Sequence, residues 1–157
     1  MNLVDLFPAS AMLLNLEARD KKSAIREMLT SLVARGEFDE DTLKKAEKAV
    51  HKRESQASTG IGKWLAVPHA KGCAFVETLV GVYARSAEGL AYESVDDEPV
   101  HVLFLVLSSD DSAPEHLAIM RRVAALHRDE KSLRFLTRAV DAKKITEIFK
   151  EADEQFS

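Results

Sequence analysis

Residues 102–107 read Val-Leu-Phe-Leu-Val-Leu, and every side chain in this run is apolar. A strand whose side chains are apolar on both alternating faces has to be covered on both sides, so the run predicts the central strand of a sheet. Apolar side chains recur at helical spacing both before this strand, over residues 20–36 and 39–54, and after it, between residues 112 and 149. This order predicts an α/β fold with helices on both faces of a sheet.

Local signals mark the ends of the expected helices. Aspartates stand where N-caps are needed, at Asp20, Asp39 and Asp141. Gly36 is placed to stop the first helix, since glycine readily adopts the left-handed conformation that ends helices. Ser112 and Glu115 have the spacing of a capping box, which predicts that a helix begins directly after the central strand.

Three shorter apolar runs predict further strands. They lie at residues 12–16, 64–68 and 78–84, and the second of them ends at His69. Residues 55–62, between the second helix and this strand, are small and polar and include Gly60 and Gly62, so they predict a loop.

Composition narrows the class of protein. The 157 residues fit one domain, 1–157, and the 22 basic against 26 acidic residues give a net charge of −4 that disfavours binding to nucleic acid. The run at 102–107 is far shorter than the ~18 apolar residues of a membrane span, so no membrane insertion is expected. Asp5 and the lack of early basic residues disfavour a secretory signal, and a single cysteine, Cys73, fits a reducing compartment; together they predict a cytoplasmic protein.

Metal chemistry has little support. Cys73 stands alone, and no spacing of the HExxH or CxxC type occurs, so we expect no metal site. A buried, unreactive thiol is the expected state of Cys73.

The five histidines are the groups that titrate near neutral pH, and two of them stand where sheets and helices bind anions. His69 ends a predicted strand beside a loop with Ser58, Thr59 and Gly60, whose hydroxyl and N–H groups are donors for a phosphoryl group. His116 lies in the first turn of a predicted helix, where unpaired N–H groups attract anions. Taken alone, each is equally compatible with a structural histidine, and the remaining three, His51, His101 and His127, are expected to be structural or exposed.

If His69 and His116 face each other, they form one site for phosphoryl transfer. A neutral imidazole attacks phosphorus without a strong base, and a second imidazole hydrogen-bonds the transferred group. Arg53 is a candidate clamp because a guanidinium matches phosphate geometry; the alternative is a solvated charge at a helix end.

The stretch from Glu54 to Ala70 resembles the phosphohistidine signature of phosphotransferase-system EIIA domains of the fructose/mannitol type, EIIA type 2. The signature positions that comply are Glu54, Ile61, Gly62, Leu65, Ala66, Val67, Pro68, His69 and Ala70. Three further stretches look like those of the family: Arg53-Glu54, residues 96–100 and Glu115-His116-Leu117. The resemblance covers nearly the whole chain.

The resemblance implies a three-layer α/β/α domain around a mixed sheet, with His69 as the phosphorylated residue. The phosphoryl donor would be the histidine carrier protein HPr or a nitrogen-branch homologue of HPr. His116 and Arg53 would support the phosphoryl group, with Ser58, Thr59 and Gly60 nearby. No cofactor is implied, because the phosphoryl group arrives on a protein histidine. The chain would be a component of a phosphotransferase rather than a stand-alone enzyme.

Three functions stay open at this point. The chain resembles nitrogen-regulatory EIIA proteins in length, which predicts a regulator that signals to a target protein through its phosphorylation state. Alternatively, it passes the phosphoryl group to an EIIB domain of a fructose- or mannitol-type permease, or it is a binding module that has lost phosphotransfer. Trp64 stands where the family often has glycine, and its ring is expected to narrow access to His69 or change partner contacts.

Overall fold

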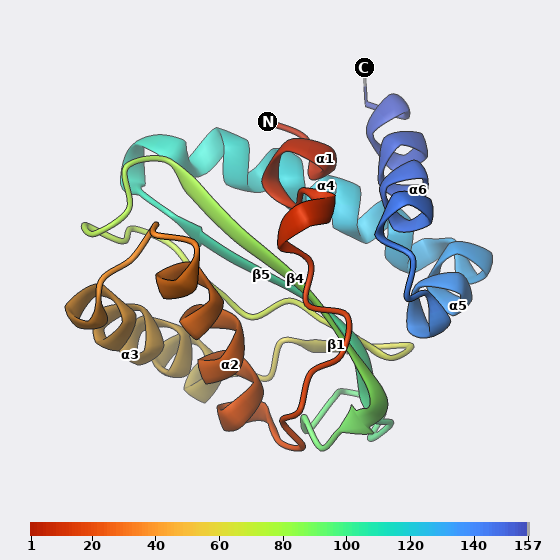
Figure 1. The fold of residues 1–157 in the computed structure, drawn as a ribbon, viewed down its shortest axis with the longest axis horizontal. Helices are drawn as coiled ribbons and strands as arrows, with labels where there is room; N and C mark the ends of the chain where they lie inside the picture. Colours follow the sequence, from red (N-terminus) through yellow and green to blue (C-terminus); the bar gives the residue numbers. More distant parts are fainter. Residues whose placement is uncertain (157) are drawn as a thin grey trace.

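The computed structural model describes residues 1–156 and shows a mixed sheet between two layers of helices (Figure 1). This confirms the predicted fold class, a mixed α/β domain. The two faces of the central strand β5 (Val100–Ser108) contact different apolar clusters. Leu103, Leu105 and Leu107 belong to one cluster, and Val102, Phe104 and Val106 belong to the other. This division explains why every position of the run is apolar.

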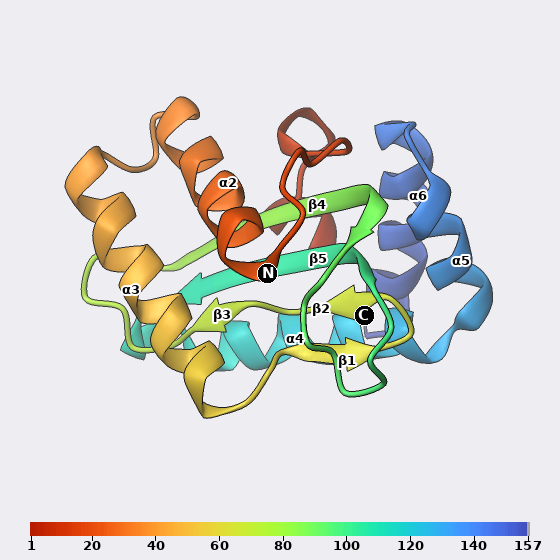
Figure 2. The ribbon, with the colours of Figure 1, turned by 90° about the horizontal axis from the view of Figure 1, so that it is seen from below.

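The sheet is built around β5. The other strands are β1 (Gly60–Gly62), β2 (Leu65–Ala66), β3 (His69–Ala70) and β4 (Leu79–Leu90). β4 runs antiparallel along one edge of β5, whereas β2 and β3 both run parallel to its other edge, and β1 forms a hairpin with β2. Figure 2 shows β3 beside the arrowhead of β5 and the β1–β2 hairpin toward its beginning. Residues 60–70 therefore extend along a single edge of the central strand.

One face of the sheet is covered by α2 (Lys21–Ala34) and α3 (Glu40–Gln56). The Asp20 side chain accepts a hydrogen bond from the N–H of Ser23, and Asp39 accepts one from Thr42, as the predicted N-caps require. Gly36 follows α2 with a φ of 77°, the left-handed conformation predicted for the helix stop.

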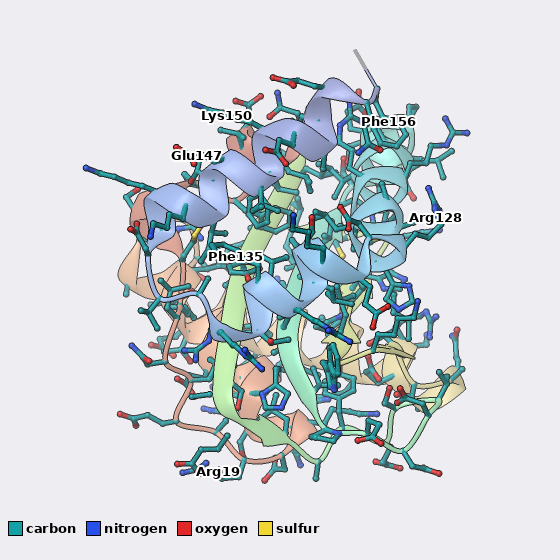
Figure 3. All side chains as sticks on the ribbon, turned by 90° about the vertical axis from the view of Figure 1, so that its right-hand side faces the viewer. Arg19, Arg128, Phe135, Glu147, Lys150 and Phe156 are labelled. Carbon is teal, nitrogen blue, oxygen red and sulfur yellow. The ribbon has the colours of Figure 1, made fainter. Side chains whose placement is uncertain are left out.

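The other face is covered by α1 (Leu3–Leu6), α4 (Ala113–Arg128), α5 (Glu130–Arg138) and α6 (Ala142–Glu154). Figure 3 looks onto α5 and α6, which cross in front of β4 and β5. Asp153 of α6 accepts hydrogen bonds from the backbone N–H groups of Leu3, at 2.8 Å, and Val4, at 3.2 Å, so the last helix holds the first one. None of the helices within residues 1–156 is both long and apolar enough to cross a membrane.

The short strands differ from the predictions. Residues 12–16 form no strand, and only Leu13 bridges to Ala84 of β4. The predicted strand at 64–68 is split, because Val67 and Pro68 separate β2 from β3, and His69 begins β3 rather than ending a strand. The loop predicted at 55–62 contains β1 at its end.

The predicted capping box of Ser112 and Glu115 was wrong. The Ser112 hydroxyl donates to the carbonyl of Thr78 at 2.8 Å instead of capping α4. The box forms three residues earlier, between Ser109 and Ser112, at the start of a short 3₁₀ helix (Asp110–Ser112). α4 still begins where predicted, with Pro114 in its first turn.

Candidate active site

His69 is held by the end of the sheet. It pairs with Val106 of β5, two residues before that strand ends. Its Nδ1 lies 2.7 Å from the carbonyl oxygen of Val67. A carbonyl only accepts hydrogen bonds, so Nδ1 carries the proton and Nε2 carries the lone pair. The fold thus fixes both the position of the ring and the nitrogen that can act as a nucleophile.

His116 stands next to His69, as the sequence predicted for a joint site. The two ring centroids lie 5.6 Å apart, with an edge-to-face angle of 68°. His116 is in the first turn of α4 and is 2% exposed. The short 3₁₀ helix after β5 turns the chain so that α4 begins beside the end of the sheet. Residues that are 47 positions apart in sequence therefore share one site.

One ring nitrogen of His116 has a hydrogen-bond partner and the other has none among residues 1–156. Its Nδ1 lies 2.6 Å from the hydroxyl oxygen of Ser108, the last residue of β5. Its Nε2 is buried without a hydrogen-bond partner among residues 1–156. A buried polar atom without a partner is uncommon and can bind a water or a ligand atom. His51 Nε2 and the Tyr83 hydroxyl are also without a hydrogen-bond partner in the described part of the chain, but His116 is the one that stands beside His69. Sequence reasoning missed Ser108, although its position at the end of a buried strand beside a predicted site was a usable signal.

Both imidazoles are neutral at pH 7. Burial lowers the pKa of His69 below its ordinary value of 6.5, and the positive charges of Arg53 and Lys71 lower it further, against the opposing effect of the hydrogen bond to Val67. Burial, followed by the nearby charge of His69, lowers the pKa of His116 to about 4. A neutral His69 keeps its Nε2 lone pair, which is the form that attacks phosphorus.

A cavity of about 570 Å³ opens beside His69, and its charged lining is entirely positive. Lys52 and Arg53 come from the end of α3, and Lys71 directly follows β3. Arg53 is anchored by a hydrogen bond of 2.9 Å from its Nη1 to the carbonyl of Ala57. The structure thus brings Arg53 to the same cavity as His69. Three cations around a neutral nucleophile form a site for an incoming anion.

Ser58, Thr59 and Gly60 do not line this cavity. The Gly60 N–H donates to the Ser58 hydroxyl at 3.2 Å, and that hydroxyl donates to the carbonyl of Tyr92 at 3.4 Å. A Cβ atom on Gly60 would lie 2.9 Å from the Cα of Ser94, so close packing explains this glycine. Binding of the phosphoryl group by these three residues stays a prediction.

Thr59 belongs to a buried polar network that sequence reasoning did not find. Its hydroxyl bonds to the carboxylate of Glu54 and lies 3.0 Å from the hydroxyl of Tyr92, which in turn donates to Glu54 at 3.0 Å. Lys21 completes the network with an ion pair to Glu54 at 3.1 Å. Burial raises the pKa of Tyr92, so its hydroxyl stays protonated and remains a donor. The network ties α2, α3 and the segment leading to His69 together.

Trp64 lies away from His69, contrary to the expectation that its ring narrows access. The neighbouring residue Leu65 pairs with Val102, whereas His69 pairs with Val106. Four residues of strand separate these positions, which is roughly 13 Å along β5. The indole lines a second cavity at the other end of the sheet.

Comparison with known proteins agrees with this geometry. Residues 5–152 match the family described as "Phosphoenolpyruvate-dependent sugar phosphotransferase system, EIIA 2". The chain belongs to this family. This confirms the resemblance drawn from residues 54–70.

Relatives of similar sequence include both sugar-specific components of the phosphotransferase system and nitrogen regulatory proteins. The chain is 31% identical over 153 residues to the fructose-specific EIIABC component of Bacillus subtilis; the match covers 98% of this chain but only 24% of that longer protein. It is 29% identical over 145 residues to a nitrogen regulatory protein of Bradyrhizobium diazoefficiens, with 92% of each chain covered. The solved structure of the nitrogen regulatory protein IIA-Ntr from Neisseria meningitidis has the same fold, with a TM-score of 0.82, 23% identity, and coverage of 92% of this chain and 97% of that one.

Proposed function

We propose that the chain is a phosphohistidine carrier of the phosphoenolpyruvate-dependent phosphotransferase system and accepts a phosphoryl group on Nε2 of His69. The observation that carries the proposal is the pair of histidines. Nδ1 of His69 is bound to the Val67 carbonyl, and the neighbouring His116 has a buried nitrogen with no partner among residues 1–156. A phosphoryl oxygen on Nε2 of His69 is a partner for that nitrogen.

The transfer step balances without a cofactor. The Nε2 lone pair of His69 attacks phosphorus on a phosphohistidine of the donor, which we propose is HPr or a nitrogen-branch homologue. The new N–P bond forms while the donor's N–P bond breaks, and the electron pair of the broken bond stays on the donor's imidazole. Positive charge develops on the His69 ring. The Val67 carbonyl stabilises this charge, because it accepts the Nδ1 proton at 2.7 Å.

His116 supports the transferred group as a neutral hydrogen-bond donor. To donate from Nε2, its ring must hold the proton there and accept a hydrogen bond at Nδ1. The Ser108 hydroxyl, 2.6 Å away, is the donor that selects this tautomer. The positive charges of Lys52, Arg53 and Lys71 attract the phosphorylated donor. They also stabilise the negative charge on the equatorial oxygens of the phosphoryl group during transfer.

A regulatory role is the branch that we favour. The match to the nitrogen regulatory protein covers 92% of both chains. In this role the phosphorylation state of His69 would control binding to a target protein in the cytoplasm. Transport is the second candidate, and the 31% identity to a fructose-specific EIIABC component supports it. The acceptor would then be an EIIB domain.

Intact mass spectrometry tests the carrier function. The chain is mixed with phosphoenolpyruvate, enzyme I and HPr, and we expect a gain of about 80 Da, one phosphoryl group, that is labile to acid. The His69→Ala variant should gain nothing. The matched control is His51→Ala, which removes a half-buried histidine outside the cavity and should be labelled like the wild type.

Two outcomes would contradict the proposal, and a further experiment separates its two branches. Equal labelling of His69→Ala would place the phosphoryl group elsewhere. A lack of gain with HPr and with nitrogen-branch homologues would leave the third function, a binding module without phosphotransfer. If the wild type is labelled, purified EIIB of the fructose type separates the branches, because rapid transfer to it would favour transport over regulation.

A further inference from the structure

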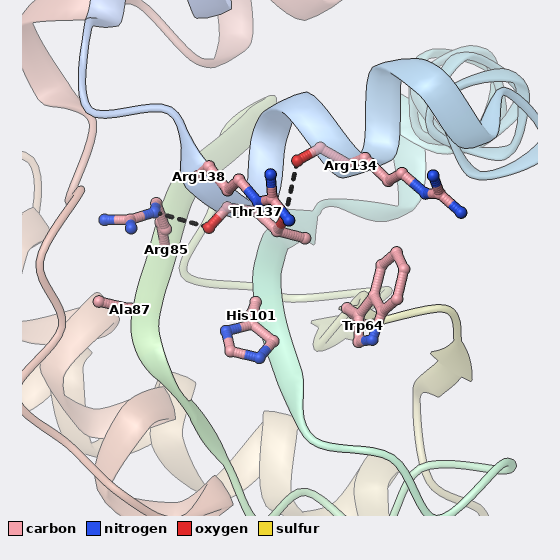
Figure 4. A pocket seen from close by; sticks show the side chains of 7 residues that line it. All are labelled: Trp64, Arg85, Ala87, His101, Arg134, Thr137 and Arg138. Carbon is pink, nitrogen blue, oxygen red and sulfur yellow. Dashed lines mark hydrogen bonds between the residues drawn. The ribbon is translucent and has the colours of Figure 1, made fainter.

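A second cavity, of about 540 Å³, lies at the end of the sheet away from His69. Its walls come from the β1–β2 turn, the facing ends of β4 and β5, and α5 (Figure 4). Trp64 and His101 form its lower part in this view, and Arg138 and Arg134 of α5 stand above them. The volume is in the range of about 300–1,000 Å³ that small-molecule sites occupy.

The cavity is cationic in a chain whose net charge is −4. Arg85 is 8% exposed, and its guanidinium donates to two neutral carbonyls, those of Leu14 at 2.9 Å and Thr137 at 3.0 Å. Within residues 1–156, neither Arg85 nor Arg138 forms an ion pair, and Arg134 pairs only with Glu130 at the surface. The three guanidinium groups of the cavity therefore have a single carboxylate partner between them, Glu130, which pairs with Arg134. A buried charge without a counter-ion is unfavourable, and an anionic ligand would relieve it.

Trp64 is presented to this cavity by a strained turn. Gly62 pairs with Leu65, so Lys63 and Trp64 alone connect β1 to β2. Both have left-handed backbones, with φ of 52° and 70°. Two such residues form the type I′ turn, which favours Asn-Gly, and each other L-residue there costs roughly 1–2 kcal/mol. Strained residues of this kind cluster at ligand sites.

The indole packs in part against the apolar cluster on this face of the sheet, and the rest of the ring borders the cavity. Trp64 is half-buried, and no aromatic or cation–π contact within the described part of the chain involves it. The ring nevertheless borders the cavity that the arginines line. A flat aromatic surface beside guanidinium groups offers stacking for a planar ring and paired donors for phosphate oxygens.

We propose that this cavity binds a nucleotide. The base stacks on the indole of Trp64, and the phosphates lie against the guanidinium groups of Arg134 and Arg138. Arg85 adds a fixed positive charge from below the surface, because its two carbonyl contacts hold it in place. The site is separate from the phosphoryl site at His69, and the proposal does not depend on phosphotransfer.

The chain has one tryptophan, so its fluorescence reports on this cavity alone. ATP is titrated while Trp64 emission is recorded, and equilibrium dialysis with labelled ATP gives an independent affinity. We expect saturable quenching, with ATP binding at least tenfold more tightly than adenosine or pyrophosphate. The Arg134→Ala/Arg138→Ala double variant should bind ATP at least tenfold more weakly. Its charge-matched control, Lys44→Ala/Lys48→Ala on the exposed side of α3, should bind like the wild type.

Four outcomes would overturn the proposal. The first is dialysis that retains no ATP, and the second is equal retention by the arginine double variant and the wild type. The third is pyrophosphate or adenosine binding as tightly as ATP, since one half of the ligand would then be irrelevant. The fourth is loss of ATP binding in His69→Gln, which would place the nucleotide in the other cavity.

Discussion

The cavity beside His69 and the cavity beside Trp64 are alike in size, at about 570 and 540 Å³, and each is lined by three basic side chains. Each also has a histidine whose Nδ1 contacts a carbonyl, Val67 for His69 at 2.7 Å and Ser86 for His101 at 2.8 Å. They differ in a second ring. The buried imidazole of His116 stands beside His69, with 5.6 Å between the ring centroids, but does not itself line that cavity, whereas the indole of Trp64 lines the other. In our proposals the positive charge of both cavities binds a phosphate group, and the imidazole of His116 beside His69 is the feature that distinguishes the site proposed for transfer.

Removing that imidazole is the strongest test of the comparison. His116→Ala should slow phosphoryl transfer from phosphorylated HPr by about 10²–10³-fold, the usual effect of losing one donor to a developing anion. Rapid-quench measurement of label on His69 gives the rate. His127→Ala, at the other end of the same helix, should transfer at the wild-type rate. ATP binding should be unchanged in His116→Ala. A transfer rate for His116→Ala close to that of the wild type would contradict the assigned role.

The buried imidazole should also make stability depend on pH. The pKa of His116 falls to about 4 in the folded chain from 6.5 when exposed, so the unfolded state binds more protons between these values. The free energy of unfolding should therefore fall as pH drops from 6.5 to about 4, by up to ~3 kcal/mol for this group. Urea unfolding across this range measures the effect. His116→Asn should show a shallower pH dependence, and an unchanged slope in that variant would be evidence against the shift.

Ser108→Ala tests the selection of the His116 tautomer. One net hydrogen bond contributes about 0.5–1.5 kcal/mol, so transfer should slow by up to about tenfold. Nitrogen NMR of His116 should show the proton on Nε2 in the wild type and a mixture of tautomers in the variant. Ser86→Ala, which removes a buried serine at the other cavity, serves as control. A mixture already present in the wild type would refute the selection by Ser108.

The Lys63→Asn variant tests the backbone strain in the turn beside the Trp64 cavity, and its expected effect on stability is the smallest of these predictions. Asparagine tolerates the left-handed backbone that Lys63 adopts at φ 52°, so the variant should be more stable by about 0.5–1 kcal/mol. Thermal or urea unfolding measures the gain. Lys48→Asn, in the middle of α3, should instead lose a few tenths of a kcal/mol because asparagine is a weaker helix former. Destabilisation by both changes would show that the turn is not strained.

Local chemistry explains what the sequence predicted well. Asp20 and Asp39 cap helices through contacts three residues away, and β5 is apolar throughout because both its faces are covered. The neighbouring positions of His69 and His116 were expected only on condition that the strand and helix ends meet, and the family signature raised that expectation.

The features that the sequence did not predict depend on contacts between distant elements. The run at 64–68 is split because its pairing is set by β5, some 35 residues later. Thr59 was predicted to bind phosphate, yet its hydroxyl contacts Glu54 and Tyr92, which no local pattern joins. Trp64 is five residues from His69 in the chain, but an extended backbone carries it to the other end of the sheet.

The contact of Asp153 with Leu3 and Val4 has a consequence for how such a domain can be handled genetically. Because these hydrogen bonds hold α1 against α6, the two helices lie side by side, and a short peptide would connect them. A circular permutant opened elsewhere should keep every layer intact. The same proximity would allow the domain to be inserted into a surface loop of another protein, because both connections would be made at one site.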